Sequence, residues 1–365
     1  MGNYLNPDNS KFQRAVNSDI YVDKTGLIKY TNRVMNTMQA YVCVSRPRRF
    51  GKSMAADMLT AYYSKGCDSR EVFSGLEITE DETFDRYLNK YDTVFLNVQE
   101  FLSRSSDVKE LIARIKQRVI RELTRQYPDV ELFDSTDLAE TMQDIYAESK
   151  CPFVLIIDEW DCIFREFKND KEAQEKYLDF LRDLIKDKSY IHLAYMTGIL
   201  PIKKYGTHSA LNMFDEFSMI DPGPLASYVG FTESEVEKLC GEYQMDIDEI
   251  RNWYDGYRFG STDVYCPWDV LNHCDKIKEN AAAFPENYWV HTSSNEAVKK
   301  IIQMSGNITT KREIERLLAG EEIVKEIRQE LTYQEMYQSV ENIWSLLFMT
   351  GYLTQRGSGR VDAKP

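Results

Sequence analysis

The residues Arg46–Ser53 combine positive charge, a glycine and a hydroxyl in an order suited to binding phosphate. They read Arg-Pro-Arg-Arg-Phe-Gly-Lys-Ser. A Walker A loop reads G-x-x-x-x-G-K-S/T. Gly51, Lys52 and Ser53 match its last three positions, whereas Arg46 stands where the first glycine is usual. The matching half is the part that contacts the β- and γ-phosphates and magnesium.

Each of these three residue types has a defined task at a triphosphate. Gly51 lets the backbone turn so that its amides face phosphate oxygens, and Lys52 places its ammonium on the β- and γ-phosphates. The Ser53 hydroxyl ligates Mg²⁺. We predict that ATP and Mg²⁺ bind through Arg46, Pro47, Arg48, Arg49, Phe50, Gly51, Lys52, Ser53 and Met54. The alternative is a basic surface turn that contains Gly-Lys-Ser by chance.

A second candidate segment is the acidic pair Asp158-Glu159, which follows five apolar residues, Phe153–Ile157. An apolar strand ending in Asp is typical of Walker B, where the Asp orients magnesium and a following Glu polarises the attacking water. Asp158 is therefore predicted to hold the metal with Ser53, and Glu159 to act as the catalytic base. The alternative is that Asp158 caps the next helix. Asp161 is expected either to be structural or to contact the residues that bind magnesium and water.

Thr197 completes the predicted catalytic set of Glu159, Lys52 and Thr197. It follows the apolar run Ile191–Met196, and a polar residue at such a strand tip can sense the γ-phosphate and hold the lytic water. The alternative is a simple turn residue. Lys203 and Lys204 lie just beyond, and we expect them to be solvated surface charges rather than phosphate ligands.

Short apolar runs alternate with longer amphipathic segments over the first 221 residues, which predicts a parallel sheet with helices on both faces. In such a sheet, ligands bind at the carboxyl ends of the strands. All three chemical segments follow a predicted strand directly. The predicted strands are Tyr41–Val44, Thr93–Val98, Phe153–Ile157, Ile191–Met196 and Phe217–Ile220. The predicted helices are Thr25–Met38, Met54–Tyr63, Ser106–Tyr127, Leu138–Glu148 and Lys171–Lys186.

The pattern of predicted elements changes near Asp221, from alternating strands and helices to mostly short helices. Pro222 and Pro224 flank Gly223 at this point. We place a boundary here, between a P-loop domain at residues 1–221 and a smaller α-rich domain at residues 222–365, with a short hairpin at its end. Its predicted helices are Thr232–Tyr243, Asp246–Tyr254, Pro267–His273, Asn295–Ile302, Lys311–Leu318 and Val340–Thr350. Two aromatic-rich turns, at 253–257 and 265–268, suit core packing better than nucleobase stacking.

The composition restricts the class of protein. The formal net charge of −14, from 45 basic and 59 acidic residues, disfavours nonspecific coating of nucleic acid, which needs many Lys and Arg facing phosphates. The seven Cys are odd in number and lack C-x-x-C spacing, which favours a reducing cytoplasm over a disulfide framework. We find no secretory signal and no run of about 20 apolar residues, so we expect a cytoplasmic protein without a membrane segment.

Five motifs together resemble the AAA-ATPase-like family of bacterial P-loop proteins. They are Tyr21-Val22-Asp23-Lys24, Ser45 to Ser53, Ile156 to Asp161, Thr197 to Leu200, and Trp253 to Tyr257. In this family Arg46 is the expected residue. The resemblance runs from about Tyr4 to Tyr352, and it implies a winged-helix-like domain after the ATPase core. Many members carry a C-terminal PD-(D/E)XK nuclease domain, and we expect this chain to stop before such a domain begins.

The leading functional hypothesis is a P-loop ATPase in which hydrolysis changes how the second domain packs on the core. The alternative is a nucleotide-gated binding module with little intrinsic hydrolysis, which would act on a protein partner or nucleic acid. A phosphotransferase would use the same loop, but no acceptor site stands out. Besides ATP, the expected partners are a protein or a second copy of the chain. Nucleic acid is less favoured because no basic stripe is present.

Overall fold

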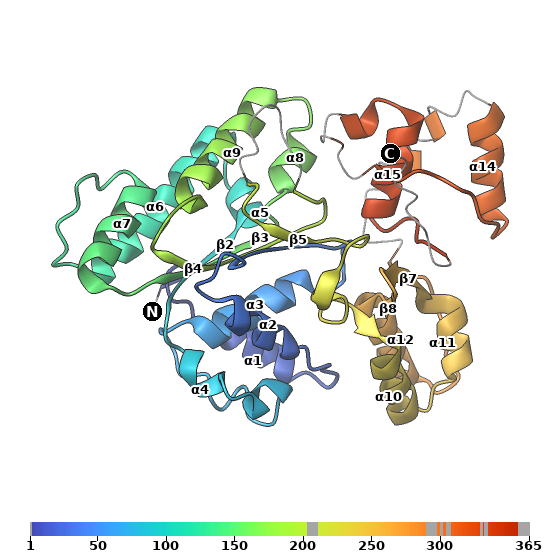
Figure 1. The fold of residues 1–365 in the computed structure, drawn as a ribbon. Helices are drawn as coiled ribbons and strands as arrows, with labels where there is room; N and C mark the ends of the chain where they lie inside the picture. Colours follow the sequence, from blue (N-terminus) through green and yellow to red (C-terminus); the bar gives the residue numbers. More distant parts are fainter. Residues whose placement is uncertain are drawn as a thin grey trace. The chain divides into compact units, whose positions relative to one another are not determined.

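Five parallel strands form the sheet that carries Asp158 and Thr197. Their order is β2-β3-β4-β1-β5, and each adjacent pair runs parallel. The strands are β1 (Tyr41–Ser45), β2 (Asp92–Asn97), β3 (Phe153–Asp158), β4 (Ile191–Gly198) and β5 (Asp215–Phe217). The sheet and its flanking helices confirm the predicted α/β fold (Figure 1).

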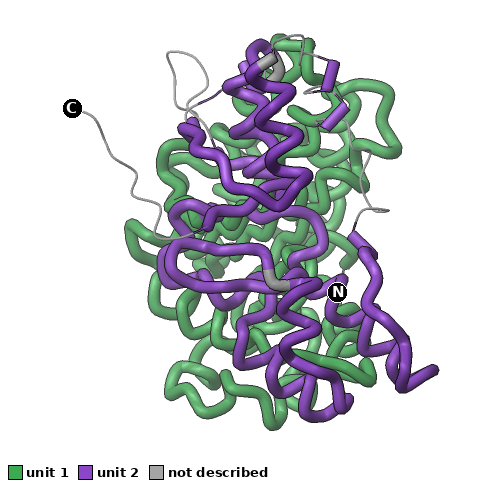
Figure 2. Tube along the Cα trace, turned by 90° about the vertical axis from the view of Figure 1, so that its right-hand side faces the viewer, with its two compact units in different colours: residues 1–45, 52–198, 204–217 green, residues 46–51, 199–203, 218–365 purple. Residues whose placement is uncertain are grey.

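The computed structural model describes residues 2–202, 211–289, 298–299, 302–303, 308–328, 331 and 335–356. The chain divides into two units (Figure 2). Unit 1 comprises residues 1–45, 52–198 and 204–217, and unit 2 comprises residues 46–51, 199–203 and 218–365. The predicted helix Asn295–Ile302 lies mostly outside the described residues, as do Lys203 and Lys204.

Helices cover both faces of the unit 1 sheet, with α1 to α4 on one side and α5 to α9 on the other (Figure 1). They are α1 (Ser10–Val16), α2 (Gly26–Val34), α3 (Lys52–Tyr63), α4 (Phe84–Tyr87), α5 (Val98–Leu102), α6 (Val108–Gln126), α7 (Leu138–Ser149), α8 (Cys162–Glu166) and α9 (Lys171–Ile185), with the 3₁₀ turn η1 (Glu77–Glu80) before α4. The residues of β3 are fully buried, as expected for a strand covered on both faces.

Local sequence signals explain where these helices begin. At α6 the Asp107 carboxylate accepts a hydrogen bond of 2.8 Å from the amide of Glu110, so Asp107 is the N-cap residue. The buried side chains of α6 recur at helical spacing, from Val108 through Leu111 and Ile115. The predicted strand Phe217–Ile220 is misplaced, because Ser218 Oγ accepts from the amides of Ile220 and Asp221 and turns the chain there.

Unit 2 contains a small antiparallel sheet, whereas the sequence predicts only a short hairpin at the end of this region. Its strand order is β6-β8-β7. The strands are β6 (Phe231–Thr232), β7 (Asp255–Phe259) and β8 (Thr262–Tyr265). The hairpin β7–β8 turns at Gly260, whose φ of +58° favours glycine. This described hairpin lies in the middle of the region rather than at its end.

The helices of unit 2 follow the predicted order within the described residues. They are α10 (Glu233–Tyr243), α11 (Ile247–Tyr254), α12 (Pro267–Glu279), α14 (Ile308–Leu318) and α15 (Val340–Met349), with 3₁₀ turns η2 (Gly223–Leu225) and η4 (Glu335–Tyr337). Thr232 and Glu235 form a capping box at the start of α10.

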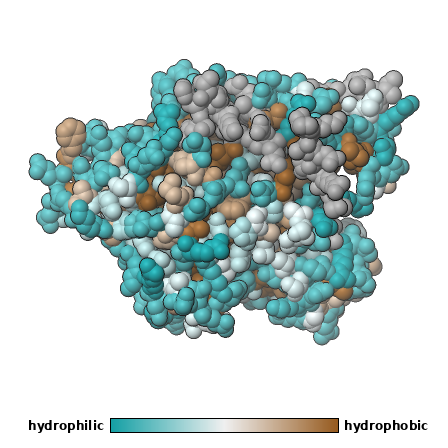
Figure 3. Space-filling model, in the orientation of Figure 1, coloured by the Kyte–Doolittle hydropathy of each residue, from teal (hydrophilic) through white to brown (hydrophobic). Residues whose placement is uncertain are grey.

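The face drawn in Figure 3 is mainly hydrophilic, with apolar residues in small separate groups. No helix among the described residues is long and apolar enough to cross a lipid bilayer.

Candidate functional site

Asp158 is the last residue of β3, and its carboxylate is hydrogen-bonded by three other elements of unit 1. The Thr197 hydroxyl of β4 donates to Oδ1, and Asn97 Nδ2 of β2 donates to Oδ2 at 3.1 Å. The Ser53 hydroxyl, in the first turn of α3, is also hydrogen-bonded to this carboxylate. The structure therefore brings together Ser53, Asp158 and Thr197, which are more than 100 and about 40 positions apart along the chain.

The parallel register explains this convergence. Asn97 pairs with Asp158 across β2 and β3, and Thr197 lies at the same end of the neighbouring strand β4. In a parallel sheet these ends share one edge. Asp158 does not cap the following helix, since the N-cap residue of α8 is Asp161. Thr197 is fully buried within β4 and is not a turn residue.

Burial and charge act against each other on the two ionisable groups at this edge. Burial raises the pKa of Asp158, and the charge of Glu159 adds to the rise, while hydrogen bonds from Thr197 and Ser53 lower it. Burial lowers the pKa of Lys52, and the nearby charges of Glu159 and Asp158 oppose this change. Lys52 thus lies close enough to Asp158 and Glu159 for both charges to affect its pKa.

Glu159 follows β3 in a left-handed backbone conformation, with φ of +56°. Such a conformation is strained for a residue other than glycine, and it is common at functional sites. The adjacent amide of Trp160 donates to the carbonyl of Thr197 at 3.0 Å, which ties this turn to β4. The Glu159 carboxylate forms an ion pair with Arg165 of α8.

The loop residues 46–51 belong to unit 2 and pack there on aromatic side chains. Arg46 is fully buried, and its guanidinium lies 4.7 Å from the ring centroid of Phe259. The Arg49 guanidinium lies 4.2 Å from the ring centroid of Trp268. Both separations suit cation–π attraction.

Unit 2 also contacts the backbone of the loop 46–51. The indole Nε1 of Trp289 donates to the Arg48 carbonyl at 3.3 Å. Phe50 packs edge-on against Tyr257, with ring centroids 4.9 Å apart. Gly51 adopts φ of +92°, a conformation that few other residues reach without strain. The aromatic turns of unit 2 therefore pack on the loop, in line with the predicted packing role.

Two further motif segments lie in unit 1. Met54, the residue after Ser53, leaves 43% of its surface exposed on α3. Asp23 of the Tyr21–Thr25 segment accepts hydrogen bonds from the amides of Thr25 at 2.8 Å and Glu77 at 2.7 Å. These bonds anchor the segment to η1 rather than to the sheet.

The oxygen atoms of Ser53 and Asp158 have the chemistry that Mg²⁺ prefers, because hydroxyl and carboxylate oxygens are hard ligands. They are already hydrogen-bonded to each other, so their oxygens lie within reach of a shared ion. These residues therefore fit a magnesium site.

The structure adds two residues that sequence reasoning missed. Asn97 ends β2 and holds Asp158, and the rule that polar residues at strand tips approach the ligand would have found it. Arg165 pairs with Glu159 and also lies 3.4 Å from Asp161, measured from Nε to Oδ2. Its only sequence signal is the spacing of four residues from Asp161, which puts both on one helix face.

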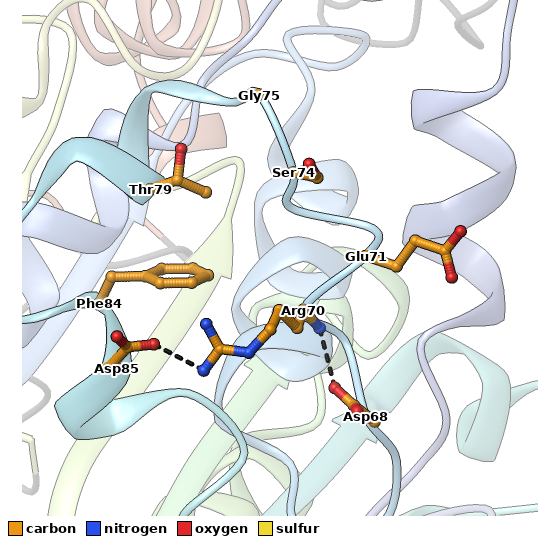
Figure 4. Close-up of a pocket in the computed structure, with 8 residues that line it drawn as sticks. All are labelled: Asp68, Arg70, Glu71, Ser74, Gly75, Thr79, Phe84 and Asp85. Atoms are coloured by element: carbon orange, nitrogen blue, oxygen red, sulfur yellow. Dashed lines mark hydrogen bonds and ion pairs between the residues drawn. The ribbon is translucent and has the colours of Figure 1, made fainter.

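A cavity of about 630 Å³ lies elsewhere in unit 1 and contains none of the predicted site residues (Figure 4). Its lining includes the exposed ion pair of Arg70 and Asp85, 2.6 Å between Nη2 and Oδ1. Its three acidic lining residues outnumber its one basic residue, so it does not suit a phosphate group. The lining residues are Asp68, Arg70, Glu71, Ser74, Gly75, Thr79, Phe84 and Asp85.

A protein of Azotobacter chroococcum mcd 1, described as an uncharacterized protein in the vnfD 5′ region, is 24% identical over 352 residues. The match covers 94% of this chain and 62% of that protein, so this chain spans less than two thirds of the relative's length.

Two solved structures show a weak likeness. The Walker-type ATPase of Pyrococcus abyssi gives a TM-score of 0.38 at 13% identity, over 81% of this chain and 75% of that one. The replication initiator DnaA bound to AMPPCP and single-stranded DNA gives 0.36 at 8% identity, over 87% and 78%.

The family described as Predicted AAA-ATPase matches residues 10–207, which is more than half of the chain. This match agrees with the resemblance read from the motifs. The chain belongs to the Predicted AAA-ATPase family.

Proposed function

We propose that this protein binds ATP with Mg²⁺ and hydrolyses the ATP to ADP and phosphate. The observation that carries the proposal is the hydrogen-bonded set of Ser53, Asp158 and Thr197 at one sheet edge, with Lys52 beside it. Family membership supports it. The loop 46–51 would supply backbone amides to the phosphates, as in other P-loop proteins.

Each residue takes a separate role in the proposed reaction. Lys52 would attract the β- and γ-phosphates, and Ser53 and Asp158 would hold Mg²⁺, which would neutralise charge on the phosphate oxygens. Glu159 accepts a hydrogen bond from the attacking water and orients it, which is the work of a general base. Thr197 holds Asp158 in place through its hydrogen bond, and its hydroxyl is proposed to sense the γ-phosphate.

Hydrolysis is also proposed to alter unit 2. The loop residues 46–51 pack within unit 2, while the next residue, Lys52, begins α3 of unit 1. A change in the loop when the γ-phosphate leaves would therefore reach the aromatic residues that hold it. This supports a nucleotide-dependent switch as the outcome of turnover.

The test measures phosphate release and binding of a fluorescent ATP analogue in the wild type, Lys52→Ala and Glu159→Gln, with and without single-stranded DNA. We expect Glu159→Gln to keep binding and to lose about 100-fold or more in turnover, and Lys52→Ala to lose binding. Glu100→Gln, which alters an exposed ion pair on α5, is the matched control. Unchanged turnover in both variants would falsify the proposal.

A further inference from the structure

Arg165 joins two acidic residues that follow β3. Its Nη2 pairs with Glu159 Oε2, and its Nε lies 3.4 Å from Asp161 Oδ2. The two contacts use different nitrogens of one planar guanidinium: that to Glu159 is a hydrogen-bonded ion pair and that to Asp161 is an ion pair, so a single cation links both carboxylates.

The surroundings distinguish this arrangement from an ordinary surface ion pair. The side chains of Arg165 and Glu159 are 15% and 22% exposed, and that of Asp161 is fully buried. Burial opposes the charge on Arg165, but the charges of Asp161 and Glu159 outweigh it and raise its pKa above the usual range. Ion pairs with this degree of burial are oriented more firmly than exposed ones, which contribute little.

Asp161 is enclosed by the surrounding protein. It is fully buried, its backbone is the N-cap position of α8, and the neighbouring Trp160 carbonyl accepts a hydrogen bond of 2.9 Å from Tyr177 of α9. Asp161 therefore serves as the anchored end of the pair, and Glu159, on its strained turn, as the end that is oriented.

We propose that Arg165 is a positioning residue for catalysis, which uses Asp161 as its anchor to aim the Glu159 carboxylate at the attacking water. This inference rests on the proposed function. Arg165 lies outside the Arg46–Ser53 motif, and it would act through Glu159 rather than through the phosphates.

The test is a double-mutant cycle with Arg165→Gln, Glu159→Gln and the double variant, plus Arg165→Lys. We expect Arg165→Gln to lower kcat about 10-fold or more, a smaller loss than that of the base itself, and to leave the affinity for a fluorescent ATP analogue unchanged. In the Glu159→Gln background the same substitution should change kcat no further. Arg165→Lys should recover only part of kcat, because one ammonium cannot serve both carboxylates with fixed geometry.

Thermal unfolding of the wild type, the two single Gln variants and the double variant supplies a second readout. The effects of the two substitutions on the free energy of unfolding should not be additive, because Arg165 and Glu159 are in contact. Arg104→Gln, which removes an exposed i,i+4 pair, is the matched control. An equal loss of kcat in both backgrounds, or a parallel loss of ATP affinity, would mean that Arg165 contacts phosphate directly and would overturn the inference. If Arg165→Gln does not fold, full activity in Arg165→Lys overturns it. A wild type that neither binds nor hydrolyses ATP would instead defeat the proposed function.

Discussion

The Thr197 hydroxyl donates a hydrogen bond to Oδ1 of Asp158, and this bond joins the end of β4 to the end of β3. Both residues are fully buried. A buried carboxylate needs such donors, because burial alone disfavours its charge. The bond therefore favours the ionised form of Asp158, which is the form that a metal ligand requires.

Replacing Thr197 with Val removes this donor at nearly constant volume. The pKa of Asp158, which burial already raises, should rise further because a hydrogen bond that lowers it is lost. We expect about a 10-fold or greater loss in Mg²⁺-dependent turnover, the usual effect of removing a partner of a metal ligand. Turnover should be measured against Mg²⁺ concentration and pH. Thr197→Ser keeps the hydroxyl and should stay near wild type, and equal activity of the two variants would contradict this prediction.

Asp57, one turn after Ser53, should make stability depend on pH. Burial raises the pKa of Asp57 from 3.8 to about 6, although Lys11, 3.6 Å away, opposes the rise. The folded state thus binds the Asp57 proton more tightly than the unfolded state does. The contribution of this proton to the free energy of unfolding is present below about pH 4 and is lost as pH rises through about 6. Asp57→Asn cannot ionise.

The free energy of unfolding of Asp57→Asn, relative to wild type, should therefore increase between pH 4 and pH 8. The increase is at most about 3 kcal/mol, since one pKa unit corresponds to about 1.4 kcal/mol. Urea unfolding at both pH values measures it. A difference between the two proteins that stays constant over this range would show that Asp57 does not titrate in this way.

Gly198, the last residue of β4, leaves no room for a side chain. A Cβ there would lie 2.6 Å from Trp160 Nε1 and 3.0 Å from Asp161 Oδ1. Gly198→Ala should lower the free energy of unfolding by about 1–3 kcal/mol, the usual cost of overpacking. Gly241→Ala on α10 meets no atom within 4 Å and should be neutral or stabilising. Thermal melts of both variants provide the comparison.

Trp289→Phe should weaken ATP binding although Trp289 is not among the residues proposed to bind ATP or Mg²⁺. The substitution removes the donor to the Arg48 carbonyl and frees the loop backbone. Loss of one hydrogen bond of about 1 kcal/mol corresponds to about a 5-fold weaker affinity. Calorimetric titration with ATP measures the change. Trp253→Phe, at a side chain that is 53% exposed on α11, is the control, and equal affinities of the two variants would count against a role for Trp289.

Periodicity and local chemistry were sufficient to predict much of the framework. Five apolar residues before Asp158 predicted a strand, which is covered on both faces, and the apolar spacing of α6 predicted that helix nearly to its ends. The misplaced fifth strand and the missed β7–β8 hairpin have local causes. A Ser218 side chain bound to the backbone and a short turn at Gly260 leave little trace in hydropathy.

Sequence order alone determined that Gly51, Lys52 and Ser53 adjoin one another, and that acidic and hydroxyl residues end two predicted strands. Only the tertiary structure decided which side chains meet. Parallel pairing of β2, β3 and β4 brings Asn97, Asp158 and Thr197 to one edge, and the turn after β3 brings Arg165 onto Glu159. The physical reason is that local pattern specifies each element, whereas contacts between distant elements depend on register and burial.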